Sequence, residues 1–121
     1  MNSRSLVVKV TAGKDDQERC NQALTVAATA VASGLQVSLW LTGEAAWFAL
    51  PDRADDVALP HAAPLGQLLG KVLDEGTVTV CTQCASRRDI TAKDTIKGVR
   101  IAGASTFLAE IMTEGAQALV Y

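Results

Sequence analysis

The chain has 121 residues, of which 49% are hydrophobic and 20% are charged, and these proportions suit one soluble globular domain with its own core. Its formal net charge is −2, with 11 basic residues against 13 acidic ones, which excludes binding to nucleic acid or an anionic membrane through a strongly basic surface. Only 4% of the residues are aromatic, so the core must be built mainly from aliphatic side chains.

Neither a secretion signal nor a membrane span is predicted. The apolar run at residues 6–10 is short and is interrupted by Lys9, unlike the apolar region of a signal peptide. The longest weakly polar run, residues 23–32, is too short to span a bilayer. Three cysteines, an odd number, do not suggest a framework of disulfides. We therefore expect a cytoplasmic protein whose thiols are reduced.

Short apolar runs alternate with helical patterns in the first half of the chain. Asp15 and Glu18 have the spacing of a capping box at a helix start, and Gly34 is typical of the residue just beyond a helix end. Cys20 falls on the apolar side of this helix, so we predict that it lies in the core. The elements expected here are a strand at 6–11, a helix at about 16–33, a strand at 35–41 and a brief helix at 44–50.

The second half begins with an irregular segment and then resumes the alternation. Residues 51–63 contain two of the three prolines and the single histidine, His61, which is typical of a surface loop. Pro64 is expected as the first residue of the next helix, and Gly76 as its end. The elements expected from there are a strand at 77–80, a helix or turn beginning at 82–84, a helical turn at 91–97, a strand at 99–102, a helix at 105–113 and a strand at 118–121.

This alternation of strands and helices predicts an α/β fold. The strands are short apolar runs without a clear period of two, which is typical of a parallel sheet covered on both faces. We therefore expect a single domain over residues 1–121, a three-layer α/β/α sandwich with a five-stranded, mainly parallel sheet. In such sheets, ligands bind beyond the carboxyl ends of the strands.

The stretch VTVCTQCASRR, residues 78–88, is the strongest candidate for a functional site. Cys81 ends the expected strand, so its sulfur should lie at the carboxyl edge of the sheet. A helix N-terminus favours a thiolate by only ~0.3–1 kcal/mol, less than the ~1.4 kcal/mol of one pKa unit, so Arg87 or Arg88 would have to contribute. The alternative is that Cys81 and Cys84 are small residues of the core.

Two other chemistries compete for Cys81-Thr82-Gln83-Cys84. A zinc site would need two more ligands, and only Cys20 and His61 are candidates, so no metal is expected. A thioredoxin-type dithiol would also place CxxC between a strand and a helix. The thioredoxin fold, however, carries this motif early and a proline after it, whereas all three prolines here precede Cys81. A dithiol redox role on another fold stays open.

Two further features suggest binding surfaces. Gly13-Lys14-Asp15-Asp16 lies at a turn from strand to helix, where an anion can approach, although the turn lacks the spacing of a phosphate-binding loop. Trp47 and Phe48 are adjacent in a short helix and cannot both face the same core. One of the two rings is therefore expected at an interface between subunits.

Nearly the whole chain resembles the DsrE/DsrF-like family, which includes the TusD-type sulfur-relay subunits. The likeness runs through KVTAGKDDQERCNQALTVAATAVASG, LQVSLWLTGEAA, VCTQCASRRDI and GVRIAGASTFLAEIMTEGAQALVY. In that family a strand-end cysteine precedes a short helical turn with one or two arginines, a pattern that Cys81, Arg87 and Arg88 match. Some members also carry a second cysteine, as Cys84 does here. The family usually has glycine where this chain has Asp89, a carboxylate that would oppose the positive field.

The resemblance implies an all-parallel homo-oligomer (dimer, trimer or hexamer) that exchanges sulfur with donor and acceptor proteins, with no metal or organic cofactor. Cys81 would accept persulfide sulfur as a thiolate, and Arg87 or Arg88 would stabilise that thiolate. Cys84 would resolve the persulfide or line the pocket. Two other functions stay open: an oligomeric binding or assembly module whose cysteines are structural, and a CxxC dithiol redox protein.

Overall fold

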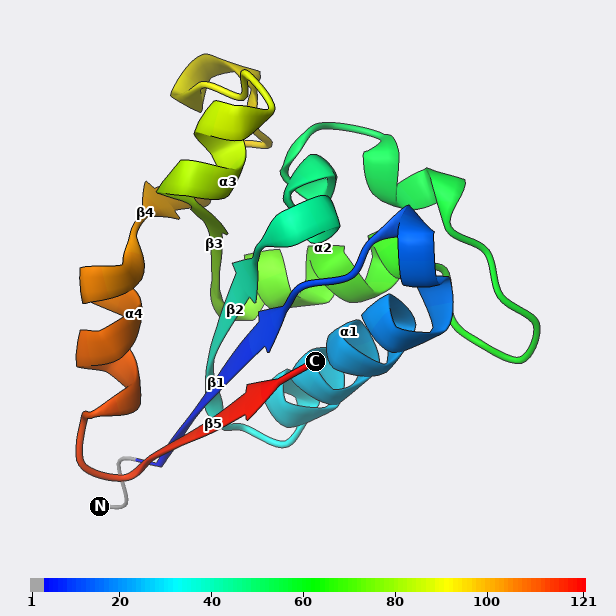
Figure 1. Ribbon diagram of the computed structural model, residues 1–121. Coiled ribbons are helices and arrows are strands. Elements are labelled where there is room, and N and C mark those ends of the chain that lie inside the picture. Colours follow the sequence, from blue (N-terminus) through cyan, green and yellow to red (C-terminus); the bar gives the residue numbers. More distant parts are fainter. Residues whose placement is uncertain (1–3) are drawn as a thin grey trace.

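The computed structural model describes residues 4–121 and has a five-stranded, all-parallel sheet with helices on both faces (Figure 1). The predicted three-layer α/β/α fold is therefore confirmed. The sheet has the spatial order β4-β3-β2-β1-β5. Its strands are β1 (Ser5–Val10), β2 (Gln36–Leu41), β3 (Thr77–Cys81), β4 (Val99–Ala102) and β5 (Ala116–Val120).

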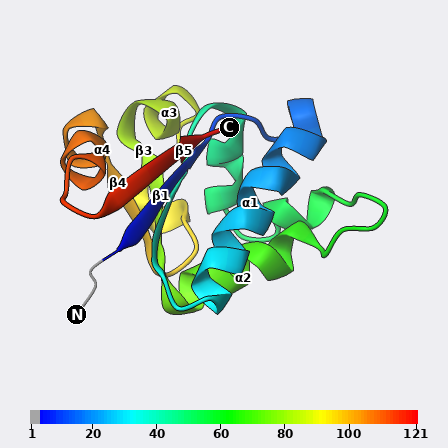
Figure 2. The same ribbon diagram turned by 90° about the horizontal axis from the view of Figure 1, so that it is seen from below.

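The helices cover the two faces of the sheet unequally. Helices α1 (Gln17–Ala32) and α2 (Leu65–Glu75) pack side by side on one face, and α4 (Ala104–Ile111) lies alone on the other (Figure 2). A short helix, α3 (Thr82–Arg87), follows β3 directly. Four short 3-10 helices complete the described elements: η1 (Lys14–Asp16), η2 (Gly43–Ala49), η3 (Arg53–Asp56) and η4 (Ala92–Asp94).

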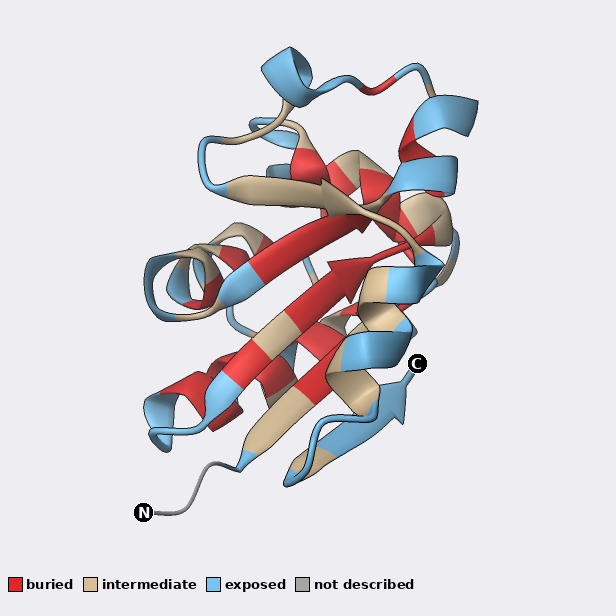
Figure 3. Cartoon of the chain, turned by 90° about the vertical axis from the view of Figure 1, so that its left-hand side faces the viewer, coloured by how far each residue is buried: buried red, intermediate tan, exposed pale blue. Residues whose placement is uncertain are grey.

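The two faces also differ in chemistry. The register places Lys9, Trp40, Thr79 and Arg100 in one row across four strands, and this row lies on the α4 face. The α1/α2 face instead presents buried aliphatic side chains, which include Val8, Val10, Leu39, Leu41, Val78 and Val80. Figure 3 shows the buried central strands beside the largely exposed α4 and β5. The expected lack of a period of two is thus wrong for β3, where threonine and valine alternate between the faces.

Two helix starts differ from the sequence expectation. The N-cap of α1 is Asp16, whose carboxylate accepts the Arg19 N–H at 3.2 Å, whereas Asp15 accepts the Gly13 N–H at 2.8 Å. The predicted capping box of Asp15 and Glu18 is therefore wrong. Pro64 has an extended backbone (φ −55°, ψ 137°) and caps α2 instead of being its first residue.

Most other boundaries shift by one or two residues. The irregular segment 51–63 contains the short η3, and the helical turn expected at 91–97 is confined to η4. Strand β5 begins two residues earlier than expected, because Ala116 and Gln117 pair with β1. Gly34 has φ 86°, the left-handed conformation that suits glycine just after α1.

Within residues 4–121, no helix combines the length and the apolar character that crossing a membrane requires.

Candidate functional site

Cys81 lies where the sequence predicts it, at the carboxyl end of β3. It is the last residue of the strand and the N-cap of α3, which begins at Thr82. Its side chain is half-buried, whereas Cys84, one helical turn further on, is 9% exposed. Residues three apart on a helix share a face, so both thiols are directed at the same region of the sheet edge.

Both cysteines line a cavity of about 310 Å³ on the α4 face, which we call the Cys81 pocket. Strands β1 and β2 contribute Lys9 and Trp40 to its wall, and α4 contributes Phe107. The Phe107 ring packs edge-on against Trp40, with 5.3 Å between the ring centroids. The pocket is therefore a mainly apolar recess with a single ammonium group, open at the edge of the sheet where ligands bind in parallel α/β folds.

The surroundings of Cys81 favour its thiolate. Partial burial raises the pKa of this thiol, but the opposing effects outweigh burial and leave the pKa below its ordinary value. The N–H groups of Cys84 and Gln83 at the start of α3 lower the pKa, as do the Cys84 thiol and the positive charge of Lys9. A partly exposed cysteine with a lowered pKa is the type that reacts as a nucleophile.

Lys9 reaches the pocket from a strand that does not neighbour β3. In the register, Lys9 is level with Trp40 on β2 and Thr79 on β3, and Thr79 is two residues before Cys81 on the same face. The Lys9 ammonium lies 5.2 Å from the centroid of the Phe107 ring, a cation–π geometry that holds it inside the pocket. Sequence reasoning missed Lys9, because only the strand pairing brings it near the cysteine.

Cys84 is held in place by the backbone of η2. The Gly43 N–H donates a hydrogen bond to Cys84 Sγ at 3.2 Å. Gly43 has φ 54°, and a Cβ at this position would lie 2.5 Å from the Thr11 carbonyl oxygen, so glycine is required here. The second thiol of the motif is thus buried and fixed, while the first faces the pocket.

The two arginines of the motif have different surroundings. Arg88 Nη2 pairs with Glu44 Oε2 at 2.7 Å, and its Nη1 donates to the Cys84 carbonyl at 3.1 Å. Arg88 therefore ties α3 to η2. Arg87, the last residue of α3, is exposed. The charge that lowers the pKa of Cys81 is that of Lys9, and a thiolate-stabilising role for either arginine stays a prediction.

Asp89 has a backbone conformation that suits glycine, the residue that the family resemblance leads one to expect at this place. It follows α3 with φ 55°, in the left-handed region that glycine adopts most easily and aspartate tolerates better than most residues. The Asp89 side chain is exposed.

The remaining cysteine and the histidine lie elsewhere. Cys20 is fully buried in α1, as predicted, and burial, together with the charges of Asp15 and Asp16, raises its pKa to about 12. His61 is an exposed loop residue. Among residues 4–121, no three His, Cys, Asp or Glu side chains gather as metal ligands would, and all three cysteines are free thiols.

Three solved structures share this fold. The ychN protein from E. coli has a TM-score of 0.80 at 18% identity, and the protein MTH1491 from Methanobacterium thermoautotrophicum has 0.73 at 11% identity. Each comparison covers 98% of this chain and 99% of the other. The protein BT1422 from Bacteroides thetaiotaomicron has a TM-score of 0.59 at 16% identity, covering 100% of this chain and 98% of the other. MTH1491 and BT1422 are described as proteins of unknown function.

Sequence comparison identifies the family. The uncharacterized protein MJ0760 of Methanocaldococcus jannaschii is 32% identical over 99 residues, which cover 81% of this chain. The chain spans only about a third of that relative, 36% of its length. A model of the DsrE/DsrF-like family matches residues 4–121, from the start of the described structure to its end. The chain therefore belongs to the DsrE/DsrF-like family.

Proposed function

We propose that the protein is a sulfur-relay protein that accepts a sulfur atom on Cys81 as a persulfide and passes it to another thiol. The observation that carries this proposal is the half-buried Cys81 thiol, with its lowered pKa, facing a pocket that also holds the Lys9 ammonium. Membership of the DsrE/DsrF-like family supports the same class of function.

The proposed transfer consists of two thiol exchanges. The Cys81 thiolate attacks the terminal sulfur of a donor persulfide, R–S–SH, so that a new S–S bond forms and the donor leaves as the thiolate R–S⁻. Cys81 then carries the added sulfur as Cys81–S–SH. An acceptor thiolate attacks that terminal sulfur, and Cys81 is released as a thiolate. Lys9 stabilises the anionic sulfur in both steps, and the pocket shields the persulfide from other thiols.

The proposal includes partners and a compartment. We expect a cytoplasmic homo-oligomer that meets separate donor and acceptor proteins. Exposed apolar side chains support the oligomer: Leu108 on α4 is 57% exposed, Met112 just beyond α4 is 74% exposed, and Val120 on the edge strand β5 is 64% exposed. A second copy of the chain would remove these side chains from water.

The test is mass spectrometry of the purified protein after treatment with a low-molecular-weight persulfide donor. The expected product is one added sulfur atom on the peptide that contains Cys81. C81S should abolish the addition. C20S is the matched control, because Cys20 is fully buried and has a raised pKa, so its loss should leave the labelling of Cys81 unchanged. Absence of added sulfur in the parent protein would reject the proposal.

A dithiol–disulfide function is the second candidate. The arrangement that favours it is an accessible Cys81 followed one helical turn later by the buried Cys84, which accepts the Gly43 N–H. In this case Cys84 would attack the Cys81 persulfide, form a Cys81–Cys84 disulfide and release HS⁻. C84S separates the two functions: a carrier keeps or prolongs its persulfide in this variant, whereas a redox dithiol loses its activity. A protein in which neither thiol reacts would be the binding or assembly module.

A further inference from the structure

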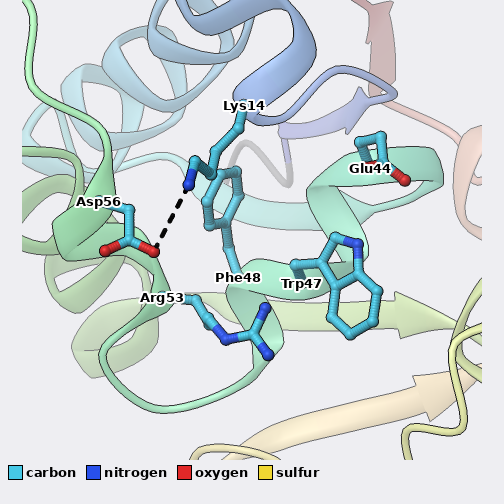
Figure 4. Close-up of a pocket in the computed structure, with 6 residues that line it drawn as sticks. All are labelled: Lys14, Glu44, Trp47, Phe48, Arg53 and Asp56. Atoms are coloured by element: carbon cyan, nitrogen blue, oxygen red, sulfur yellow. Dashed lines mark ion pairs between the residues drawn. The ribbon is translucent and has the colours of Figure 1, made fainter.

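A second cavity lies on the far side of η2 from the Cys81 pocket. It has a volume of about 250 Å³ and is lined by Lys14, Glu44, Trp47, Phe48, Arg53 and Asp56, and we call it the Trp47 cavity. These residues come from η1, η2 and η3, which follow the carboxyl ends of β1 and β2. Figure 4 shows Lys14, Arg53, Asp56 and Trp47 arranged around one opening, with the Phe48 ring among them.

The charges of this cavity favour an anion. Glu44 is already neutralised by Arg88 at 2.7 Å. Lys14 Nζ and Asp56 Oδ2 are 3.9 Å apart, and both side chains are at least half exposed, so this ion pair is weak and easily exchanged. Arg53 has no ion pair or hydrogen-bond partner within residues 4–121. The cavity therefore has a surplus positive charge on Arg53, beside a lysine that can change partner.

Arg53 is also held in an orientation that suits an anion. Its guanidinium lies over the Trp47 ring, with 4.9 Å from Cζ to the ring centroid. No described side chain or backbone group of residues 4–121 takes up the N–H donors of this guanidinium, so they can bind a carboxylate or phosphate in a bidentate way. The cavity thus presents a guanidinium group directly beside an aromatic ring.

The frame of the cavity is fixed by a close backbone contact. A Cβ at Gly13 would lie 2.6 Å from the Glu44 carbonyl oxygen, so only glycine allows the turn before η1 to touch the start of η2. The backbones that carry Lys14 and Glu44 are therefore held close together. Phe48, 2% exposed, closes the inner end. The cavity is preformed, and it is smaller than the ~300–1,000 Å³ typical of sites for drug-sized ligands.

We propose that the Trp47 cavity binds a small organic anion in which a carboxylate or phosphate group is attached to a flat apolar group. The charged group pairs with Arg53 and Lys14, and the flat group packs against Trp47 and Phe48. This site is independent of persulfide transfer on Cys81, since η2 separates the two cavities.

Nuclear magnetic resonance of the ¹⁵N-labelled full chain tests the proposal, because the two tryptophans report on the two cavities separately. Trp47 lines the Trp47 cavity, and Trp40 lines the Cys81 pocket. The probes are phenyl phosphate and benzoate, each titrated to about 10 mM, which would saturate a site with a millimolar Kd. We expect a saturable shift of the Trp47 indole N–H resonance and none of Trp40. Inorganic phosphate, which lacks the flat group, should bind more weakly.

Substitutions then assign the charged partner. R53Q should weaken the binding of the tighter probe by at least about tenfold, since charge-assisted hydrogen bonds are lost. R19Q is the matched control, because Arg19 carries the same charge on α1 and contacts Asp16 outside the cavity. K14Q should also weaken the binding of this probe, but by a smaller factor than R53Q. A shift of Trp40 alone, no shift of Trp47, or equal affinity in R53Q and R19Q would each overturn the proposal.

Discussion

Lys9 and Cys81 come from β1 and β3, and β2 lies between them in the sheet. Because neighbouring parallel strands run in register, residues far apart in the chain stand level with one another, and alternate residues share a face. In the sheet, Trp40 on β2 lies between Lys9 on β1 and Cys81 on β3, and all three residues line the same pocket at the carboxyl edge. The aromatic ring of Phe107 holds the ammonium at this place in a mainly apolar recess, where its field is screened less than on an open surface.

The first prediction concerns the reactivity of Cys81. Replacing Lys9 by methionine keeps an unbranched apolar chain of similar length and removes the charge, so the pKa of Cys81 should rise. Alkylation by iodoacetamide near pH 7 should be roughly two- to fivefold slower, because a partly screened charge contributes on the order of 0.5–1 kcal/mol. The measurement is the alkylation rate as a function of pH, and in K9M the curve should move to higher pH.

R87Q and R88Q are the controls for this prediction. Each removes one positive charge near the same helix, but Arg88 is paired with Glu44 and Arg87 is exposed. If an arginine variant slows the alkylation and K9M does not, then the thiolate depends on the arginine, as expected from the sequence.

At the level of the elements, α4 is attached to the sheet through polar contacts. Every residue of this helix is at least partly exposed, so a buried apolar stripe does not hold it. Glu110 makes the main contacts: Ser38 Oγ donates to its carboxylate at 2.6 Å, Trp40 Nε1 donates at 2.9 Å, and Arg100 forms an ion pair with it. Since α4 also contributes Phe107 to the Cys81 pocket, Glu110 helps to fix the wall of that pocket.

The second prediction follows from the pKa of Glu110. Burial raises this pKa, but the hydrogen bonds from Ser38, Arg100 and Trp40 and the charge of Arg100 outweigh burial and lower it. A carboxyl whose pKa is lowered by folding adds stability above its unfolded pKa, and this stability is lost as the pH falls through the folded value. The free energy of unfolding should therefore fall below about pH 4 more steeply in the parent than in E110Q.

At neutral pH, E110Q should be less stable than the parent by about 1 kcal/mol, the size expected for a partly exposed charged hydrogen bond. Urea unfolding at several pH values measures both effects. E114Q is the matched control, because it makes the same charge change on an exposed residue just beyond α4. Equal pH dependence in the parent and in E110Q would show that α4 does not depend on this carboxylate.

At the level of the whole molecule, one face is much less well covered than the other. Helices α1 and α2 shield one side of the sheet, whereas the short α4 and the edge strand β5 leave apolar side chains in contact with water. Isolated apolar residues on a surface are common, but here four of them lie on the consecutive elements α4 and β5 or directly after α4: Leu108, Met112, Leu119 and Val120.

The third prediction is that this surface is an interface between copies of the chain. Light scattering at micromolar concentration should give at least the mass of a dimer for the parent protein. The double variant L108D/M112D should shift the mass toward the monomer, because charged groups in the interface lose their hydration without a partner. L35D is the control, since Leu35 is 40% exposed and lies just beyond α1, outside α4 and β5. A parent protein that is already monomeric would contradict the prediction.

The sequence predicted the fold and the position of Cys81 because both depend on local patterns. Strands and helices alternate visibly along the chain, and a β-rich run that ends in a cysteine places that cysteine at the sheet edge. The sequence predicts Asp15 as the cap of α1, whereas the structure has Asp16 in this place. The two residues are equally suitable by type, and only the turn at Gly13 decides between them.

The remaining features of the site depend on contacts between distant residues. The position of Lys9 near Cys81 can be predicted only when the order of the strands is known. The pairing of Arg88 with Glu44 joins residues 44 positions apart in the chain. The sequence predicts that one of the adjacent rings of Trp47 and Phe48 lies at a subunit interface, without deciding which one. Phe48 is buried, and the guanidinium of Arg53 lies over the Trp47 ring. An interface role for either ring stays a prediction. The contact of Arg53 with Trp47 depends on how η2 and η3 pack together, so the sequence does not reveal it.

The unequal chemistry of the two faces of the sheet has a consequence for how this protein can evolve. Residues that hold the molecule together, such as Val8 and Leu39, point to one side of the strands, and residues that line the Cys81 pocket, such as Lys9, point to the other. Mutations at pocket residues that are not buried, such as Lys9 and Gln83, therefore carry little risk to folding. Selection for a new substrate can proceed through Lys9, Gln83 and Ala104 while the aliphatic side keeps the same scaffold, so one backbone can host many unrelated specificities.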